Sequence, residues 1–179
     1  MQTHMLEPHP ANPPRDVTGV SASLGWRPHW LTVRFRIEQA AGVVVPPLAG
    51  RGRTDGLWRT TCFELFLKND EGPGYCEFNL SPSEQWAAYE FSGVRQGMAD
   101  RTVPLAPTCT WRAGNKFAIF DAAIPLASLP GLPARAGLTA VIEEEGERMS
   151  YWALAHGGDK PDFHDPACFA AMLAPPEAP

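Results

Sequence analysis

Hydrophobic residues occur along this chain in short runs, and turn-forming residues separate one run from the next. The densest series lies between Asp55 and Phe91, where three apolar-rich runs cover residues 57–67, 75–80 and 86–91. Gly, Pro, Asn and Ser residues occupy the two gaps. Short runs at this spacing predict an antiparallel meander of three strands.

Residues 30–38 show the clearest alternation of apolar and polar positions. Leu31, Val33, Phe35 and Ile37 share one side, and polar residues stand between them. Successive side chains of a strand point to opposite faces, so this pattern predicts a strand with one buried face.

Further strands are expected in the stretches 17–24, 108–112, 116–124, 138–145, 149–155 and 168–173. No long helical pattern, internal repeat or strand–helix alternation is visible. We therefore predict an all-β, single-domain antiparallel β-sandwich of jelly-roll or immunoglobulin-like type. The predicted domain covers residues 17–173, after an extended N-terminal arm of residues 1–16 and before a tail of residues 174–179.

Composition narrows the possible partners. The 179 residues are 44% hydrophobic and 20% charged, with a formal net charge of −5. Without clustered Lys or Arg, this charge argues against a nucleic-acid partner. No apolar run is long enough to span a membrane, and the N-terminal residues lack a signal-peptide pattern. The four cysteines show no CxxC spacing, which fits reduced thiols and an expected cytoplasmic location.

Strand alternation places aromatic and acidic side chains together on one face of the meander. These residues are Trp58, Glu64, Phe66, Tyr75, Glu77 and Asn79. A sugar ring has an apolar face and hydroxyls at its edge, so such a surface is suited to a glycan. Two alternatives are an ordinary rim of half-buried aromatics with solvated acids, and an anchor for a partner protein.

The motifs in this region resemble those of a known superfamily. They are Trp58, the strand Glu64-Leu65-Phe66-Leu67, the segment Tyr75 to Pro82 with Glu77, Phe78 and Asn79, and Gln85 to Tyr89. This pattern is similar to the DOMON-like superfamily, within it to family 9 carbohydrate-binding modules, and most closely to bacterial DOMON-like proteins. The resemblance implies a non-catalytic module that binds a carbohydrate or sugar-containing metabolite on the concave sheet face.

The resemblance also implies residue roles. Sugar-binding relatives hold their ligand between two tryptophans, which match Trp58, six residues before Glu64, and Trp152. Glu77, Asn79 and Gln85 would be hydrogen-bonding neighbours. Since no export signal is visible, a cytoplasmic glycan or sugar metabolite is the expected partner.

Haem-binding relatives use a methionine and a histidine, for which Met98 and His156 are available, but we expect no haem. No metal site is predicted. The weak candidates are His156, Asp159, Asp162 and His164, in a loop where oxygen ligands leave structural calcium as an option.

Enzymatic motifs are not visible in the sequence. Glu64 and Glu77 could face one another as the carboxylate pair of a glycosidase, although binding explains them with fewer assumptions. The acidic run of residues 143–145 is interpreted as a solvated strand end. We expect no catalytic residue.

Overall fold

The computed structural model describes residues 2–176, and its regular structure is almost entirely β. No α-helix occurs within these residues. The helical turns are short 3-10 segments: η1 (Ala40–Gly42), η2 (Leu57–Arg59), η3 (Leu126–Ser128) and η4 (Pro166–Cys168). The predicted all-β class is therefore confirmed. No helix in this range is long and apolar enough to cross a bilayer.

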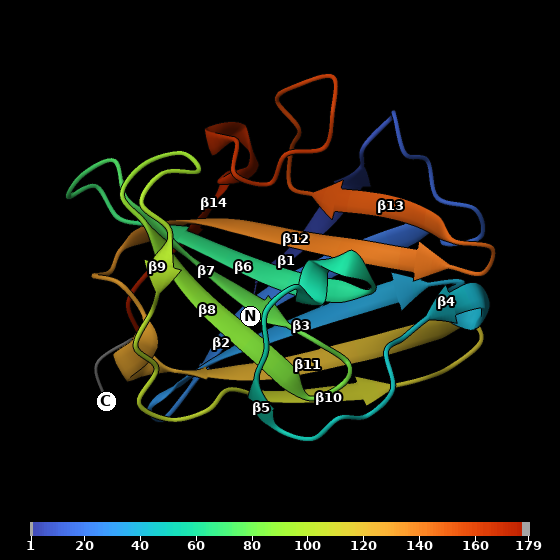
Figure 1. The fold of residues 1–179 in the computed structure, drawn as a ribbon, viewed down its shortest axis with the longest axis horizontal. Helices are drawn as coiled ribbons and strands as arrows, with labels where there is room; N and C mark the ends of the chain where they lie inside the picture. Colours follow the sequence, from blue (N-terminus) through green and yellow to red (C-terminus); the bar gives the residue numbers. More distant parts are fainter. Residues whose placement is uncertain (1, 177–179) are drawn as a thin grey trace.

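Most strands belong to one curled path of paired neighbours (Figure 1). Along it lie β10 (Thr108–Arg112), β11 (Phe117–Pro125), β3 (Trp30–Glu38), β2 (Gly19–Arg27), β1 (Gln2–Pro8), β13 (Arg148–Ala153), β12 (Ala134–Glu144), β6 (Cys62–Lys68), β7 (Tyr75–Leu80), β8 (Gln85–Phe91) and β5 (Gly52–Arg53). Beside this path, β4 (Val43–Val44) and β14 (Ala171–Leu173) pair with β12, and β9 (Ala99–Asp100) pairs with β8. The β5–β8 pair is parallel and the other pairs are antiparallel, so the sheet of the described residues is mixed, with mostly antiparallel pairing.

The strand β1 joins the two halves of this path. Residues 2–6 pair with β2, and Glu7 and Pro8 pair with Ala153 and Trp152 of β13. The sequence indicated only an irregular arm here, because the prolines and polar residues hide a strand that pairs on both sides. At the other end, residues 174–176 carry no strand, and the rest of the predicted tail lies outside the described residues.

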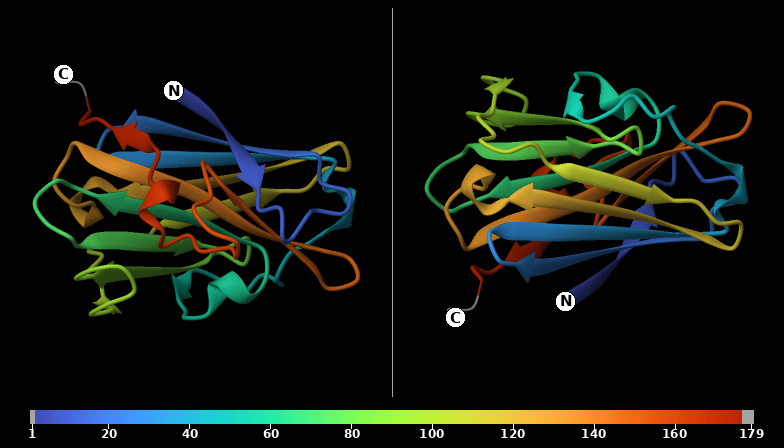
Figure 2. Two further views of the ribbon diagram at one scale, coloured as in Figure 1. Left: turned by 90° about the horizontal axis from the view of Figure 1, so that it is seen from above. Right: turned by 90° about the horizontal axis from the view of Figure 1, so that it is seen from below.

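The main core lies between the two halves of the sheet. Both views of Figure 2 place β2 and β3 (blue) on one side of the molecule and β7 and β8 (green) on the other. Phe63 of β6 bridges them, with ring centroids 4.3 Å from Phe120 of β11 and 4.8 Å from Phe35 of β3. Burying each such ring contributes about 1.5–3 kcal/mol. The buried face predicted for residues 30–38 is confirmed.

A second apolar cluster lies on the opposite side of β6 and β7. It includes Phe66, Tyr75, Phe91 and Phe169, with Tyr75 and Phe91 stacked at 4.8 Å between centroids. Since Phe63 and Leu65 face the main core, Phe66 must face away from it. This cluster forms the base on which the loops after β8 and β13 lie.

The predicted solvated strand end at residues 143–145 is wrong for Glu144, which is buried. Its side chain is 1% exposed and accepts backbone N–H groups of Arg15, Asp16 and Val17 at 2.8, 2.6 and 2.9 Å. These charge-assisted bonds fix the segment between β1 and β2 against the end of β12.

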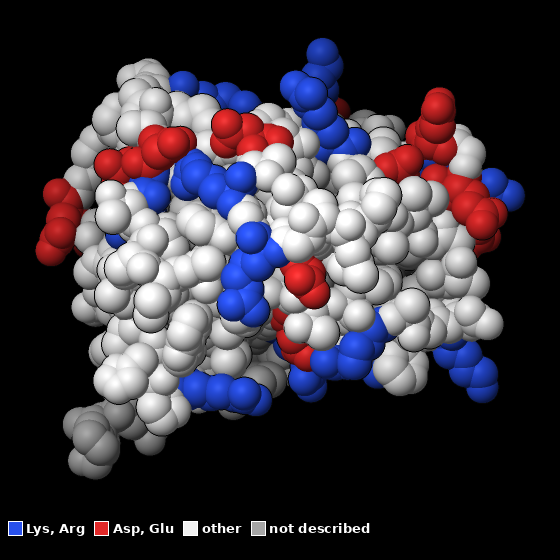
Figure 3. All heavy atoms as spheres, turned by 60° about the horizontal axis from the view of Figure 1, so that its bottom comes forward, with Lys and Arg blue, Asp and Glu red and all other residues white. Residues whose placement is uncertain are grey.

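Charged side chains of both signs are spread over the face shown in Figure 3, with uncharged surface between them. Among the described residues, that face presents no continuous cationic surface of the kind that phosphate backbones require.

Candidate ligand-binding site

A cavity of about 360 Å³ opens on the side of β6–β8 that faces away from the main core. Its volume is near the lower end of the range for small-molecule sites, about 300–1,000 Å³. The lining residues are Trp58, Glu64, Glu77, Tyr89, Phe91, Arg95, Met98, Val141, Tyr151, Pro161, Phe163 and His164. Strands supply the base and loops supply the walls, so the cavity depends on segments distant in the sequence.

The register of β6 and β7 brings two carboxylates to the cavity base. Glu64 pairs with Asn79, and Phe66 pairs with Glu77, so the two glutamates are diagonal neighbours on one face. Diagonal partners on adjacent strands lie within reach of long side chains. Alternation thus brings Glu64 and Glu77 together, as the sequence predicted.

Both carboxyl groups are almost fully enclosed. Glu64 is 3% and Glu77 6% exposed. Burial raises the pKa of Glu64 well above its usual range, and the negative charge of Glu77 raises it further. A hydrogen bond from Thr139 Oγ1 to Glu64 Oε2 at 3.1 Å lowers the pKa in part. Burial likewise raises the pKa of Glu77 to about 7, opposed by Asn79 and by the charge of Arg95. The cavity base therefore changes its charge near neutral pH.

A short hydrogen-bond chain connects Arg95, Tyr75 and His164. The Arg95 backbone N–H donates to the Tyr75 hydroxyl oxygen at 3.1 Å, and the same hydroxyl forms a hydrogen bond with His164 Nδ1 at 2.7 Å. Burial, with the nearby charge of Arg95, lowers the pKa of His164 to about 4, so the ring is neutral at pH 7. A neutral imidazole that accepts at Nδ1 carries its hydrogen on Nε2. That Nε2 lies 3.8 Å from Glu77 Oε2.

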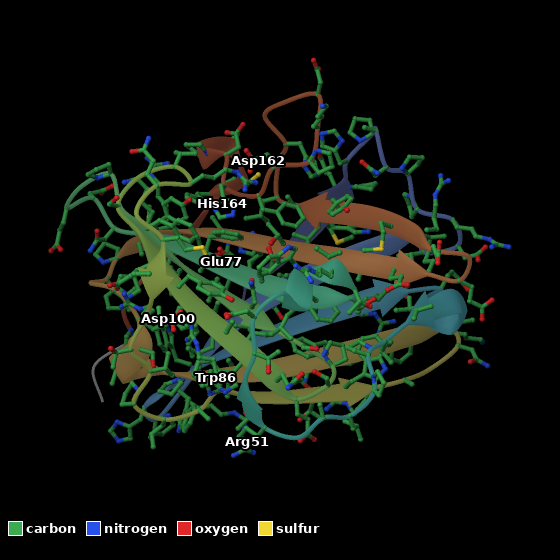
Figure 4. All side chains as sticks on the ribbon, viewed as in Figure 1. Arg51, Glu77, Trp86, Asp100, Asp162 and His164 are labelled. Atoms are coloured by element: carbon green, nitrogen blue, oxygen red, sulfur yellow. The ribbon has the colours of Figure 1, made fainter. Side chains whose placement is uncertain are left out.

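The cation at the cavity wall already has a partner. Arg95 donates to Asp162 Oδ1 at 2.7 Å, and the His164 backbone N–H donates to the same oxygen at 3.0 Å. Burial would raise the pKa of Asp162, but these hydrogen bonds and the positive charge lower it. Figure 4 shows Glu77, His164 and Asp162 following one another from the sheet towards the loop after β13. The series of contacts from Glu77 through His164 to Asp162 and Arg95 thus links the cavity base to its outer wall.

Aromatic side chains form much of the remaining wall. Trp58, on η2, is 41% exposed, which is high for an indole. Tyr151 of β13 packs edge-to-face against Phe163, with 6.1 Å between ring centroids. Trp58 and Tyr151 both line the cavity and have surface available for an apolar ligand face.

The structure brings together three of the eight ligand-binding residues expected from the sequence. Trp58, Glu64 and Glu77 line the cavity. The remaining five lie elsewhere: Phe66, Tyr75, Asn79, Gln85 and Trp152. Phe66 and Tyr75 belong to the apolar cluster behind the cavity, and Tyr75 contributes indirectly through His164.

Asn79 and Gln85 both lie outside the cavity lining, in different surroundings. Asn79 is fully buried opposite Glu64. Within the described chain its amide makes no hydrogen bond of ordinary length and angle, but it is close enough to Glu77 to lower the pKa of that carboxyl. Gln85 donates to Thr54 Oγ1 at 2.7 Å and does not line the cavity.

Trp152 does not lie at the cavity as the second stacking tryptophan that the resemblance implied. It is 2% exposed in the main core, and its Nε1 donates to Ser150 Oγ at 2.9 Å. Alternation along β13 explains this, since the neighbouring Tyr151 points to the cavity instead. The aromatic at this wall is therefore Tyr151, one position earlier.

The sequence did not identify several of the lining residues that come from loops. Arg95, Pro161 and Phe163 come from segments without usable periodicity, and their meeting depends on how two loops fold over the sheet. Tyr89 and Phe91 had a detectable signal, because alternation from the Gln85–Phe91 run places both on one face.

The candidate metal and haem ligands do not converge. His156 Nε2 donates to the Glu7 carbonyl at 2.9 Å and its ring packs against His9, whereas His164 and Asp162 lie at the cavity. Residues 2–176 contain no group of three or more His, Cys, Asp or Glu side chains placed to hold a metal ion. Met98 lines the cavity, but His156 does not.

Comparisons with known proteins identify a relative in fold. No family model and no curated protein sequence matches this chain. A candidate carbohydrate-binding protein of Bacteroides uniformis, solved by crystallography, superposes with a TM-score of 0.66 at 14% identity, over 97% of this chain and 86% of its own. A family 9 carbohydrate-binding module of Caldicellulosiruptor kristjanssonii, solved with glucose, gives a TM-score of 0.46 at 13% identity, over 82% of this chain and 73% of its own. The first likeness shows that the overall fold is shared.

Proposed function

We propose that this protein is a non-catalytic module that binds a carbohydrate or sugar-containing metabolite in the cavity between Trp58, Tyr151 and the Glu64–Glu77 pair. The observation that carries the proposal is the meeting of exposed aromatic surface and buried carboxylates in one cavity. A pyranose presents C–H groups to an aromatic face and hydroxyl donors to carboxylates.

The fold comparison and the motifs point in the same direction. The Bacteroides protein is itself described as carbohydrate-binding, and its fold covers nearly the whole chain. The motif resemblance to DOMON-like proteins, with the sandwich architecture that it implies, supports the same function. The fold comparison is independent of the cavity geometry, whereas the motifs share Trp58, Glu64 and Glu77 with the cavity.

The affinity should be modest. One stacked ring with a few hydrogen bonds must offset the entropy lost on association, which leaves dissociation constants of roughly micromolar to millimolar. A cavity of about 360 Å³ suits one or two sugar units rather than a long chain.

Isothermal titration with a panel of free and nucleotide-linked sugars tests the proposal. Trp58→Ala should weaken binding of any active sugar by about tenfold or more, because it removes the exposed stacking surface. Phe117→Ala is the matched control, since Phe117 is also exposed (43%) but lies on β11, outside the cavity. Equal affinities for the Trp58→Ala variant and the wild type would contradict the proposed site.

A further inference from the structure

The charge balance of the cavity is unusual for a site that takes only neutral sugars. Its base holds two carboxylates, Glu64 and Glu77, on neighbouring strands. The guanidinium of Arg95 is paired with Asp162 at 2.7 Å. His164 is neutral at pH 7, and its Nδ1 is hydrogen-bonded to the Tyr75 hydroxyl. Among the residues that line the cavity, the one guanidinium is therefore already paired and offsets the two carboxyl groups only in part.

The acceptors at the cavity base are also largely unused. Glu64 has one hydrogen bond, from Thr139, and Glu77 has none of ordinary length within the described residues. Glu77 is 6% exposed and lines the cavity, so its oxygens can be reached only from there. Leaving such groups unpartnered costs free energy, which a ligand could recover.

An ammonium group matches this arrangement better than a hydroxyl. It is a compact cation with three donors, and it can bond to several carboxylate oxygens at once. Its positive charge stabilises the ionised form of both carboxyl groups, which burial otherwise disfavours, whereas a neutral ligand does not. The surrounding aromatic rings add attraction through their negative faces.

We propose that the ligand carries a protonated amine, as an amino sugar does, and that Glu64 and Glu77 bind this ammonium while Trp58 and Tyr151 contact the ring. This inference rests on the proposed function, and it specifies the chemical class of the sugar. The Nε2 atom of the neutral His164 remains available to a hydroxyl of the same ligand.

Matched pairs of sugars that differ only in the amine test the inference. Glucosamine is compared with glucose, galactosamine with galactose and mannosamine with mannose, by isothermal titration at pH 7. In at least one pair we expect the amino sugar to bind about tenfold tighter or better. Titration in two buffers of different ionisation enthalpy should also show proton release, because the ammonium ionises the carboxyl pair.

Variants show whether the pair carries the preference. Glu77→Gln should bring the amine-to-hydroxyl affinity ratio close to one, while Glu84→Gln, at an exposed turn outside the cavity, should leave it unchanged. Equal or tighter binding of the neutral sugar in every pair would overturn the amine inference but leave carbohydrate binding intact.

A non-sugar probe separates the two proposals. Ethanolamine is titrated alongside the sugars, as an amine without a ring. If ethanolamine binds, Glu77→Gln abolishes this binding and no sugar binds, the proposed amine specificity is supported and the proposed carbohydrate function is wrong. If neither ethanolamine nor any sugar binds at millimolar concentration, both proposals are wrong.

Discussion

Replacing Glu77 by glutamine should change how the stability of the protein depends on pH. A carboxyl whose pKa is higher in the folded chain than in the unfolded chain binds its proton more tightly when folded. The free energy of unfolding therefore falls as the pH rises from the unfolded pKa through the folded one. For Glu77 this window runs from 4.5 to about 7.

The size of the effect follows from the width of that window. An interval from 4.5 to about 7 corresponds to about 3 kcal/mol. Glutamine stays uncharged throughout, so the stability of Glu77→Gln relative to wild type should increase by about 3 kcal/mol between pH 4 and pH 8. For a chain of this length that equals roughly 6–12 °C in the relative melting temperature. Loss of the Glu77 charge also relieves Glu64, which adds in the same direction.

Urea denaturation at several pH values measures this difference directly. Other groups that titrate in this range, including the neighbouring His164, are present in both proteins and largely cancel. Glu84→Gln, at an exposed position, should show no such trend. A stability difference for Glu77→Gln that stays constant from pH 4 to pH 8 would refute the idea that this carboxyl is held protonated by burial.

Three further substitutions test the packing described above. Trp152→Ala should lower the free energy of unfolding by about 3–5 kcal/mol, measured by denaturation, because it empties a core position. Tyr151→Ala should instead weaken ligand binding in a titration, with a smaller effect on stability; the reverse result would show that the two residues are assigned to the wrong faces. Glu144→Ala should lower the free energy of unfolding by about 3 kcal/mol or more, because three backbone N–H groups lose their acceptor. A decrease of less than about 1 kcal/mol would show that these bonds do not stabilise the fold.

The sequence predicted those features that depend on local alternation. Residues 30–38 have the expected buried face, and Glu64 and Glu77 meet because each strand presents alternate residues to one side. The all-β class follows from the short apolar runs and the turn residues between them. Each of these inferences needs only the period of a strand.

Features that depend on long-range pairing were not predictable in the same way. Strand β1 forms because its two sides find partners in distant strands, which its own composition does not reveal. Trp152 was assigned to the cavity by motif resemblance, although a shift of one residue in a strand reverses the face. Arg95 and Phe163 reach the cavity through loop conformations that carry no periodic signal.

The indole signals in a proton–nitrogen correlation spectrum, followed during titration with sugars, test the central claim most directly. Trp58 lines the cavity and is partly exposed, whereas Trp152 is enclosed in the main core. The account predicts that a sugar shifts the Trp58 indole resonance in a saturable manner and leaves that of Trp152 nearly unchanged. If no free, amino or nucleotide-linked sugar shifts the Trp58 resonance at millimolar concentration, the cavity is not a carbohydrate site.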